Sequence, residues 1–379
     1  MRSRWLAVMV ASLSACARAE GALPLGASAS DCASCHAEQA EAFASSPHAR
    51  SDRSPVLEAL RARVATAWGD RAAGQCGRCH APAHVPAAMA LGEPDHGVTC
   101  VSCHAAIGNR GERDGLLLVD PRAPIGGPFA DPEPTGAHAS RQSTLLASAS
   151  LCGTCHEVTG PSLFVEETLT EHRAASPLPD DPSCAGCHMP RREEGPIATG
   201  ASRDRARRDH GFVGLDPPWG QGPEAIARAT EASARLVGEA LALAIVRDET
   251  GLVVSVSNVG ARHAVPTGVA FLRDVWIDVE IERASGKQDL LARVIELGDR
   301  PMRGQVPVAL PADADRIEHR RLDFGQTRRV TLEVDGDVVR ARARLRARAF
   351  RQDVLEALAL GPRSDEVPVL EAAYVDWSP

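Results

Sequence analysis

Five copies of one short motif, Cys-x-x-Cys-His, run through the first half of the chain. In each copy two thiols lie three positions apart on one turn of backbone, within reach of the two vinyl groups of a single haem. The histidine that follows directly turns its imidazole to the iron as the proximal axial ligand. The cysteine pairs are Cys32 and Cys35, Cys76 and Cys79, Cys100 and Cys103, Cys152 and Cys155, and Cys184 and Cys187. The histidines are His36, His80, His104, His156 and His188. The spacing predicts five covalently attached haem c groups.

Other uses of paired cysteines explain less of the pattern. A Cys-x-x-Cys pair also serves as a zinc half-site, a redox dithiol or an iron–sulfur ligand pair, and an exported protein uses cysteines in disulfides. None of these uses requires a histidine directly after the second cysteine. The five histidines therefore favour haem.

Charge and composition narrow the class of partner. The chain has 379 residues, which is enough for two domains, and a formal net charge of −8. Each haem adds two propionates, so the loaded protein is more acidic still. This balance argues against nucleic acid as a partner.

The eleventh cysteine, Cys16, lies outside the motifs, at the end of a leader-like segment. Two arginines precede a short apolar stretch, which is typical of a signal peptide rather than a spanning helix. The sequence Leu13-Ser-Ala-Cys16 resembles a bacterial lipobox, in which the cysteine is lipidated; an ordinary signal peptide cleaved near Ala19 is the alternative. We expect an exported protein, attached by lipid to the periplasmic side of a membrane, the outer membrane in particular.

The pattern of residues divides the chain into four parts. We assign residues 1–16 to the lipoprotein signal peptide, 17–30 to a flexible tether, 31–222 to a pentahaem domain and 223–379 to a β-domain. Helices are expected over 54–68 and 142–150, with a long loop over 115–134. About 160 residues around five haems form a thin shell, so the haems themselves must supply most of the apolar core.

The last part reads as strands after one amphipathic helix. The helix is expected over 223–239. Period-two alternation then predicts strands, which we list as 241–246, 252–256, 275–281, 329–334 and 338–350. Strands at this spacing predict an antiparallel β-sandwich. The fold class is therefore a helix and loop haem domain followed by a β-sandwich.

Residues 340–348 alternate strictly between arginine and small apolar residues. The simpler interpretation of the five arginines is a solvated outer face of the sheet. The alternative is that they meet haem propionates or an acidic partner, because arginine matches carboxylates in a bidentate geometry.

Eight histidines remain after the five proximal ones, enough to give every iron a second protein ligand. They are His48, His84, His96, His138, His172, His210, His263 and His319. A bis-histidine iron passes electrons, whereas an iron with an open position binds substrate.

Several stretches resemble the multihaem cytochromes c that include hydroxylamine oxidoreductase and its tetrahaem cytochrome partners. Cys32 to Phe43 with Ser46-Pro-His48 resembles the first motif of that family with its downstream Ser-x-His. Further similar stretches are His96-Gly-Val-Thr-Cys100, Cys184-Ala-Gly-Cys-His-Met-Pro190, His210-Gly-Phe-Val-Gly214 and His263-Ala-Val-Pro-Thr-Gly268, the last with Arg262 in place of the usual glycine. The resemblance covers the haem domain and extends more weakly into a C-terminal β-domain.

The resemblance implies which histidines ligate iron from a distance. They are His48, His96, His138, His210 and His263. His84 is a weaker candidate, His172 and His319 are expected to be structural, and Met89 and Met189 are unfavoured thioether ligands. The cross-linked tyrosine of hydroxylamine oxidoreductase has no counterpart, because Tyr374 near the C-terminus is the single tyrosine. The Cys-x-x-Cys-Lys motif of pentahaem nitrite reductases is also absent.

These observations predict an electron carrier between a membrane-side donor and an exported acceptor, with redox proteins and a membrane surface as partners. The alternative is an oxidoreductase that acts on a small nitrogen or sulfur compound at one five-coordinate haem. A third interpretation is a docking subunit whose β-domain binds a partner complex.

Overall fold

The computed structural model describes residues 29–82, 97–161, 163–175 and 183–379 of the chain. Cys16, His84, Met89 and His96 lie outside the described residues, as do the expected signal peptide and most of the tether. The described chain divides into two compact units. The first contains residues up to Cys155 together with 183–212, and the second contains 156–175 and 213–379. The expected boundary at residue 222 stays a prediction.

A very short helix lies at each of the five Cys-x-x-Cys-His motifs and contains part or all of the motif. These helices are α2 (Ala29–Ala33), α6 (Gly77–His80), α7 (Cys100–His104), α8 (Ala149–Gly153) and α10 (Cys184–His188). The amide of His36 donates to the carbonyl of Cys32 over 2.8 Å, and the second motif repeats this bond between His80 and Cys76 over 3.0 Å. One helical turn per motif therefore brings two thiols and an imidazole together. Thr99 and Ser102 form a capping box on α7, which satisfies the first amides of that turn.

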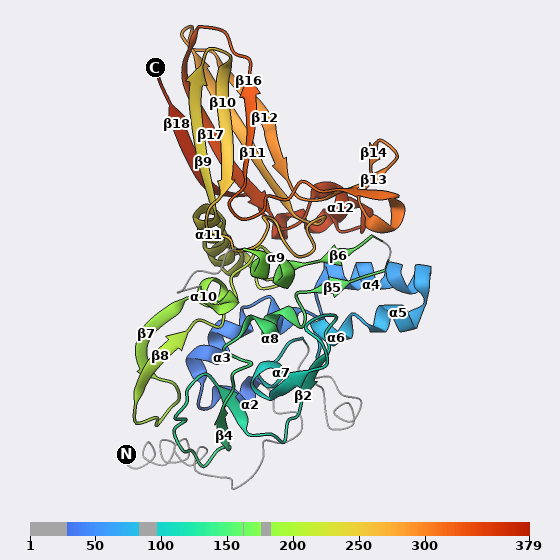
Figure 1. The fold of residues 1–379 in the computed structure, drawn as a ribbon, viewed down its shortest axis with the longest axis vertical. Helices are drawn as coiled ribbons and strands as arrows, with labels where there is room; N and C mark the ends of the chain where they lie inside the picture. Colours follow the sequence, from blue (N-terminus) through green and yellow to red (C-terminus); the bar gives the residue numbers. More distant parts are fainter. Residues whose placement is uncertain (1–28, 83–96, 162, 176–182) are drawn as a thin grey trace, which may run out of the picture. The chain divides into compact units, whose positions relative to one another are not determined.

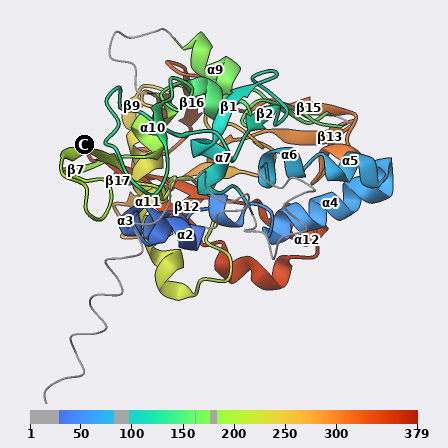
Figure 2. The same ribbon diagram turned by 90° about the horizontal axis from the view of Figure 1, so that it is seen from below.

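Longer helices occur between the first and second motifs (Figure 2). They are α3 (Ala37–Ala44) and α4 (Pro55–Trp68), and the short helix α5 (Asp70–Gly74) follows them. The expected helix over 54–68 is confirmed as α4, which starts with Pro55 in its first turn and ends at Gly69 with φ +83°.

The helix expected over 142–150 is wrong, since helical structure starts only at Ala149. Serine side chains hold the preceding turn instead, because Ser148 Oγ donates to the carbonyl of Leu145 and Ser143 Oγ accepts from the amide of Leu146. The loop expected over 115–134 contains two short strands, β2 (Leu117–Val119) and β3 (Ile125–Gly127).

Three small ladders complete the first unit (Figure 1). Strand β1 (Ala106–Asn109) pairs antiparallel with β2, and β3 pairs parallel with β4 (Ser140–Gln142). Strand β7 (Arg191–Pro196) pairs antiparallel with β8 (Asp204–Arg208).

The second unit begins with short elements around His156 and continues with one long helix. The short elements are β5 (Val158–Thr159), β6 (Val165–Glu166) and α9 (Thr168–Ala174). Helix α11 (Pro223–Ala240) confirms the helix expected over 223–239. No helix in the described residues combines the length and apolar character that a membrane crossing requires.

Two large antiparallel sheets follow α11, as the alternating sequence predicts, and a small antiparallel sheet of order β14-β13-β15 accompanies them (Figure 1). One large sheet has the order β16-β10-β9 and the other β12-β11-β17-β18. Their strands are β9 (Leu241–Asp248), β10 (Gly251–Asn258), β11 (Asp274–Arg283), β12 (Gln288–Leu297), β16 (Thr327–Leu332), β17 (Val338–Arg348) and β18 (Leu370–Trp377). The smaller elements are β13 (Arg300–Arg303), β14 (Val306–Pro307), β15 (Arg316–Glu318) and α12 (Gln352–Ala357).

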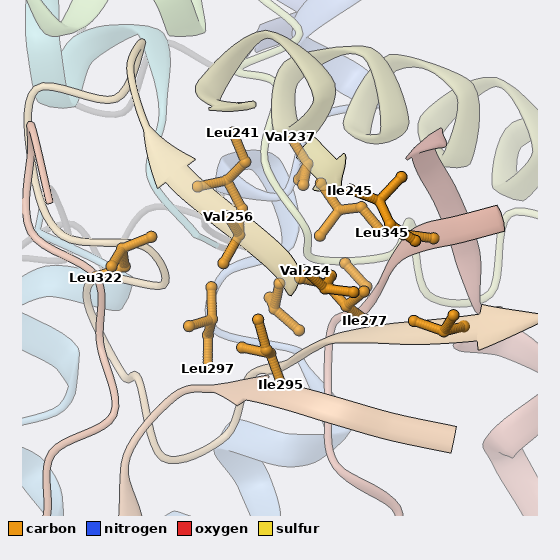
Figure 3. Close-up of a cluster of buried hydrophobic side chains, with 14 of the residues drawn as sticks. Val237, Leu241, Ile245, Val254, Val256, Ile277, Ile295, Leu297, Leu322 and Leu345 are labelled. Carbon is orange, nitrogen blue, oxygen red and sulfur yellow. The ribbon is translucent and has the colours of Figure 1, made fainter. Parts of the chain in front are cut away.

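Both sheets contribute side chains to one hydrophobic core (Figure 3). Val254 and Val256 come from the first sheet, and Ile277 and Leu345 come from the second. Each of these side chains is at most 1% exposed. The second unit therefore has an apolar interior of its own.

The alternation along β17 separates that core from a charged outer face. Ala343 and Leu345 are fully buried, and the arginines between and beside them turn the other way. Arg342 pairs with Asp376 on β18, and Arg344 pairs with Glu280 on β11 and Glu371 on β18. These arginines form ion pairs within their own sheet, as the simpler interpretation of an outer face predicts.

Candidate haem sites

His36, from the first motif, faces His138 from a distant part of the sequence. Their ring centroids lie 6.4 Å apart and their planes differ by 23°. The Nδ1 atom of His36 lies 2.8 Å from the carbonyl oxygen of Ile197. A carbonyl only accepts, so Nδ1 carries the proton and Nε2 keeps its lone pair for a metal. His138 Nδ1 lies 3.3 Å from the carbonyl oxygen of Ala139 and 3.2 Å from Ser140 Oγ.

His104, from the third motif, faces His210 in the same geometry. The centroid distance is again 6.4 Å and the planes differ by 19°. His104 Nδ1 donates to the carbonyl of Gly126 over 2.7 Å, and His210 Nδ1 donates to the carbonyl of Arg208 over 3.0 Å. Both pairs are thus built from imidazoles whose Nδ1 atoms are already used.

This spacing fits two imidazoles on opposite sides of one iron. With a metal–nitrogen bond of about 2 Å, two axial imidazoles place their ring centres roughly 6 Å apart. The near-parallel rings of both pairs meet this requirement, so the residues present fit a bis-histidine haem at each place. In the described part of the chain, no group of three or more His, Cys, Asp and Glu side chains is arranged to hold a metal ion.

Burial keeps three of these imidazoles in the form that binds iron. It is the largest cause of the lowered pKa of His104, His138 and His210. A lower pKa leaves more of the neutral imidazole at a given pH, and a metal binds the neutral form.

Two small ladders hold these ligands in a reciprocal way. The β3–β4 ladder carries the Gly126 carbonyl that orients His104, and the Ile125 amide next to it donates to Ala139, the neighbour of His138. Ile197, directly after β7, supplies the carbonyl that orients His36. His210, the candidate distal ligand, follows β8. Each ladder therefore serves the ligands of both the first and the third motif.

Ser51 organises the surroundings of the second motif. Its carbonyl lies 3.0 Å from His80 Nδ1, and its hydroxyl lies 2.8 Å from the His80 carbonyl oxygen. The same hydroxyl lies 2.9 Å from the His48 carbonyl oxygen and accepts from the Val98 amide over 3.1 Å. Gly97, at φ +92°, is required here because a Cβ would lie 2.7 Å from that His48 oxygen. The ring of His48 lies edge-on to Phe212 with a centroid distance of 4.5 Å.

Thiols of different motifs lie near enough to one another to change their pKa values. Hydrogen bonding to Cys32 raises the pKa of Cys100, hydrogen bonding to Cys79 raises the pKa of Cys155, and hydrogen bonding to Cys184 raises the pKa of Cys152. Burial raises all three further, and it alone raises the pKa of Cys103 to about 11. The first motif thus adjoins the third, and the fourth adjoins the second and the fifth.

His156 of the fourth motif bonds a carboxylate instead of a backbone carbonyl. Its Nδ1 atom lies 3.1 Å from Oε1 of Glu166, whose side chain is 9% exposed. Strand β6 carries Glu166 and pairs with β5, which begins two residues after His156. This contact lies wholly within the second unit.

The sequence and the fold were compared with known proteins. Residues 31–105 match the family described as cytochrome c554 and c-prime. The fold is similar to the crystal structure of a pentahaem cytochrome c552 from Thermochromatium tepidum, with a TM-score of 0.69 and 18% identity over 94% of this chain and 99% of that one. None of the curated proteins that were searched matches the chain.

These comparisons support a multihaem cytochrome c. The haem group of such a protein is covalently bound haem c, which agrees with the motif and with the paired imidazoles. A multihaem c-type cytochrome implies electron transfer. At 18% identity the likeness to this structure shows the fold alone.

The remaining candidate ligands of the chain lie in varied surroundings. His263 is half-buried and its Nδ1 atom donates to the Ala264 carbonyl over 2.8 Å. His172 lies on α9, and His319 lies against Asp299 with 3.2 Å between Nδ1 and Oδ1. The backbone of Met189 follows α10, and its carbonyl accepts from Arg208 over 3.1 Å. Ligation of iron by His48, His138, His210 and His263 stays a prediction.

Sequence reasoning missed Ser51 and Glu166. Ser51 lies three residues after His48, but serine is common and its contact with His80 forms only in the fold. Glu166 lies ten residues after His156 with no motif around it. Neither residue carries a spacing signal from which its role could be read.

Proposed function

We propose that the protein is an exported electron carrier with five haem c groups. The observation that carries this proposal is the pair of opposed imidazole couples, His36 with His138 and His104 with His210. Two axial imidazoles fill both open positions of an iron, so such a haem has no place for a substrate. Bound haem supplies an iron that takes up and releases one electron.

The contacts between motifs support a continuous path for electrons. Cys32 adjoins Cys100, Cys79 adjoins Cys155, and Cys152 adjoins Cys184. Cys103 of the third motif is also near enough to raise the pKa values of Cys152 and Cys155. Haems attached at adjoining thiols have neighbouring edges, and the fourth motif adjoins the most others.

The chain holds the imidazole ligands in fixed orientations, so the rings move little when an iron gains or loses an electron. The carbonyls of Ile197, Gly126 and Arg208 fix the rings of His36, His104 and His210. Such outer partners set ring orientation and the basicity of the ligand. Backbone carbonyls anchored in ladders are well suited to this task, because they have no rotamer freedom.

Further parts of the proposal rest on the sequence. The leader and Cys16 support export and a lipid anchor on the periplasmic side, where membrane-side donors and exported acceptors meet. The stretches around His48, His210 and His263 support a relationship to the hydroxylamine oxidoreductase group. The core shared by two antiparallel sheets supports a β-sandwich.

The test combines a haem count with spectroscopy of the whole ferric protein. We expect five haems per chain by pyridine haemochrome, with low-spin signals that nitrite, hydroxylamine and cyanide leave unchanged. Spectroelectrochemistry should show reversible uptake of five electrons. A high-spin haem that binds one of these molecules and turns it over would overturn the proposal in favour of an enzyme.

A further inference from the structure

The partner of His156 differs in charge from the partners of other motif histidines. The Nδ1 atoms of His36, His80 and His104 lie against the neutral carbonyls of Ile197, Ser51 and Gly126. The Nδ1 atom of His156 lies 3.1 Å from a carboxylate oxygen of Glu166. A backbone carbonyl carries a partial charge, whereas a carboxylate carries a full one, and hydrogen bonds to charged acceptors are about twice as strong.

The fold builds a buried place for this carboxylate. Glu166 is 7% exposed as a residue, and Thr168 Oγ1 lies 3.5 Å from its Oε1 atom. Gly268 lies at φ +70°, and a Cβ there would lie 3.3 Å from the same oxygen. The guanidinium of Arg273 interacts electrostatically with Glu166 and is held in place by Asp216, so a positive charge lies near the carboxylate. These contacts all lie within the second unit.

Thr267 links Thr168, a neighbour of the Glu166 carboxylate, to the side chain of Glu171. Its hydroxyl lies 2.9 Å from Thr168 Oγ1 and donates to Oε2 of Glu171 over 2.5 Å. Glu171 in turn accepts from the Ala264 amide over 3.1 Å. The stretch from His263 to Gly268, singled out in the sequence, therefore helps to position Glu166, whatever His263 itself binds.

We propose that Glu166 is a positioning residue that gives His156 anionic character and thereby lowers the reduction potential of the haem attached at Cys152 and Cys155. This inference rests on the proposed function, because it needs a haem at the fourth motif. It assigns a role to a residue that neither the haem motif nor the comparisons single out.

The direction of the effect follows from elementary electrostatics. An imidazole that donates Nδ1–H to a carboxylate is a more basic ligand than one that donates to a carbonyl. The more basic ligand stabilises ferric iron, which carries one more positive charge than ferrous iron. The haem is then harder to reduce. Since the thiols of the fourth motif adjoin those of the second and fifth, the potential of this haem affects each route through it.

The test is a potentiometric titration of the whole loaded protein and of Glu166→Gln. Glutamine keeps an acceptor oxygen but loses the charge, so it mimics the carbonyls that face His36, His80 and His104. A weakening of ferric relative to ferrous ligation by about tenfold to a hundredfold, as removal of outer partners of metal ligands causes, raises the potential by about 60–120 mV for one electron. One of the five components should move upward and the others should stay.

Glu167→Gln is the matched control. Glu167 is the next residue, it lies 3.6 Å from Arg321, and the same charge is removed without touching His156. Its titration should coincide with the wild type. Glu166→Asp retains the charge but shortens the reach to Nδ1, so it should raise the potential as well and serves as the second variant if Glu166→Gln folds poorly.

The outcomes separate this inference from the proposed function. If the titration of both Glu166 variants matches the wild type while five haems bind reversibly, the role of Glu166 is refuted and the electron carrier stands. If Glu167→Gln shifts the same component as much as Glu166→Gln, the effect is general charge and the hydrogen bond has no special role. If the haem count shows no haem at the fourth motif in the wild type, the proposed function itself fails there.

Discussion

The imidazole rings of His36 and His138 face each other with 6.4 Å between their centroids, although the two residues belong to distant segments of the chain. His36 follows two cysteines that are predicted to attach a haem, and His138 precedes β4, whose ladder with β3 fixes its position. This relationship supports the prediction that His138 is the distal ligand of the haem at the first motif.

Replacement of His138 should leave an open coordination position on the iron of the haem at the first motif. In His138→Ala the motif that contains His36 is intact, so the count of five haems should not change. One iron loses its sixth ligand, and one low-spin signal should become high-spin in the ferric EPR spectrum. His319→Ala, an exposed histidine beside Asp299, is the control and should leave the spectrum as it is. An unchanged low-spin spectrum in His138→Ala would rule out the assignment.

Removal of the Ser51 hydroxyl should weaken the segment that holds the second motif. Ser51→Ala breaks the contacts of this hydroxyl with the carbonyls of His48 and His80, and it removes one of the two acceptors of the Val98 amide, which also bonds the His48 carbonyl. The cost of such unmet polar groups is about 1–3 kcal/mol, which a thermal melt followed in the Soret band should show as a lower Tm. Ser45→Ala removes a single exposed hydroxyl contact with Ala42 and should change the Tm far less. Equal melts for the two variants would contradict the role of Ser51.

Acid should weaken the outer face of the second unit. Hydrogen bonds from Arg342 lower the pKa of Asp376 to about 2, from an ordinary value of 3.8. Since the folded pKa is the lower one, the stabilisation is complete above the ordinary value and is lost as the pH falls toward 2.

The effect of Arg342 can be measured by difference. Urea unfolding should show a slightly larger free energy of unfolding for the wild type than for Arg342→Gln near neutral pH. This difference should disappear between about pH 4 and pH 2. Arg329→Gln removes an exposed arginine on β16 and serves as the control. A difference that stays constant down to pH 2 would show that the ion pair is not its source.

Truncation of Leu345 should destabilise the β-sheet unit. Its side chain is fully buried in the core that both sheets share (Figure 3). Leu345→Ala leaves a cavity there and should cost about 2–5 kcal/mol, measured by urea unfolding with circular dichroism. Val339→Ala lies on the same strand with 39% of the residue exposed and should cost far less. Comparable losses in both variants would mean that the core is not where the structure puts it.

Local patterns predicted much of the fold. Ser54 followed by Pro55 marks the start of α4, and the alternation along β17 separates buried Ala343 and Leu345 from the arginines beside them. These features depend on neighbouring residues, so they can be read without the fold. The helix expected over 142–150 was wrong because serine hydroxyls compete there for backbone groups.

The sequence by itself determined the chemistry of each haem motif, because two thiols and an imidazole within five residues come together on one turn of backbone. It also supplied His138 and His210 as candidates through resemblance, without their partners. Only the tertiary structure decided that His138 faces His36 and His210 faces His104. The reason is physical: a distal ligand approaches the iron from the face opposite to the proximal histidine and belongs to another segment of the chain. Its position is set by ladders that join residues far apart in the sequence. Glu166 shows the same limit, because a carboxylate acts on His156 through a contact that only the fold creates.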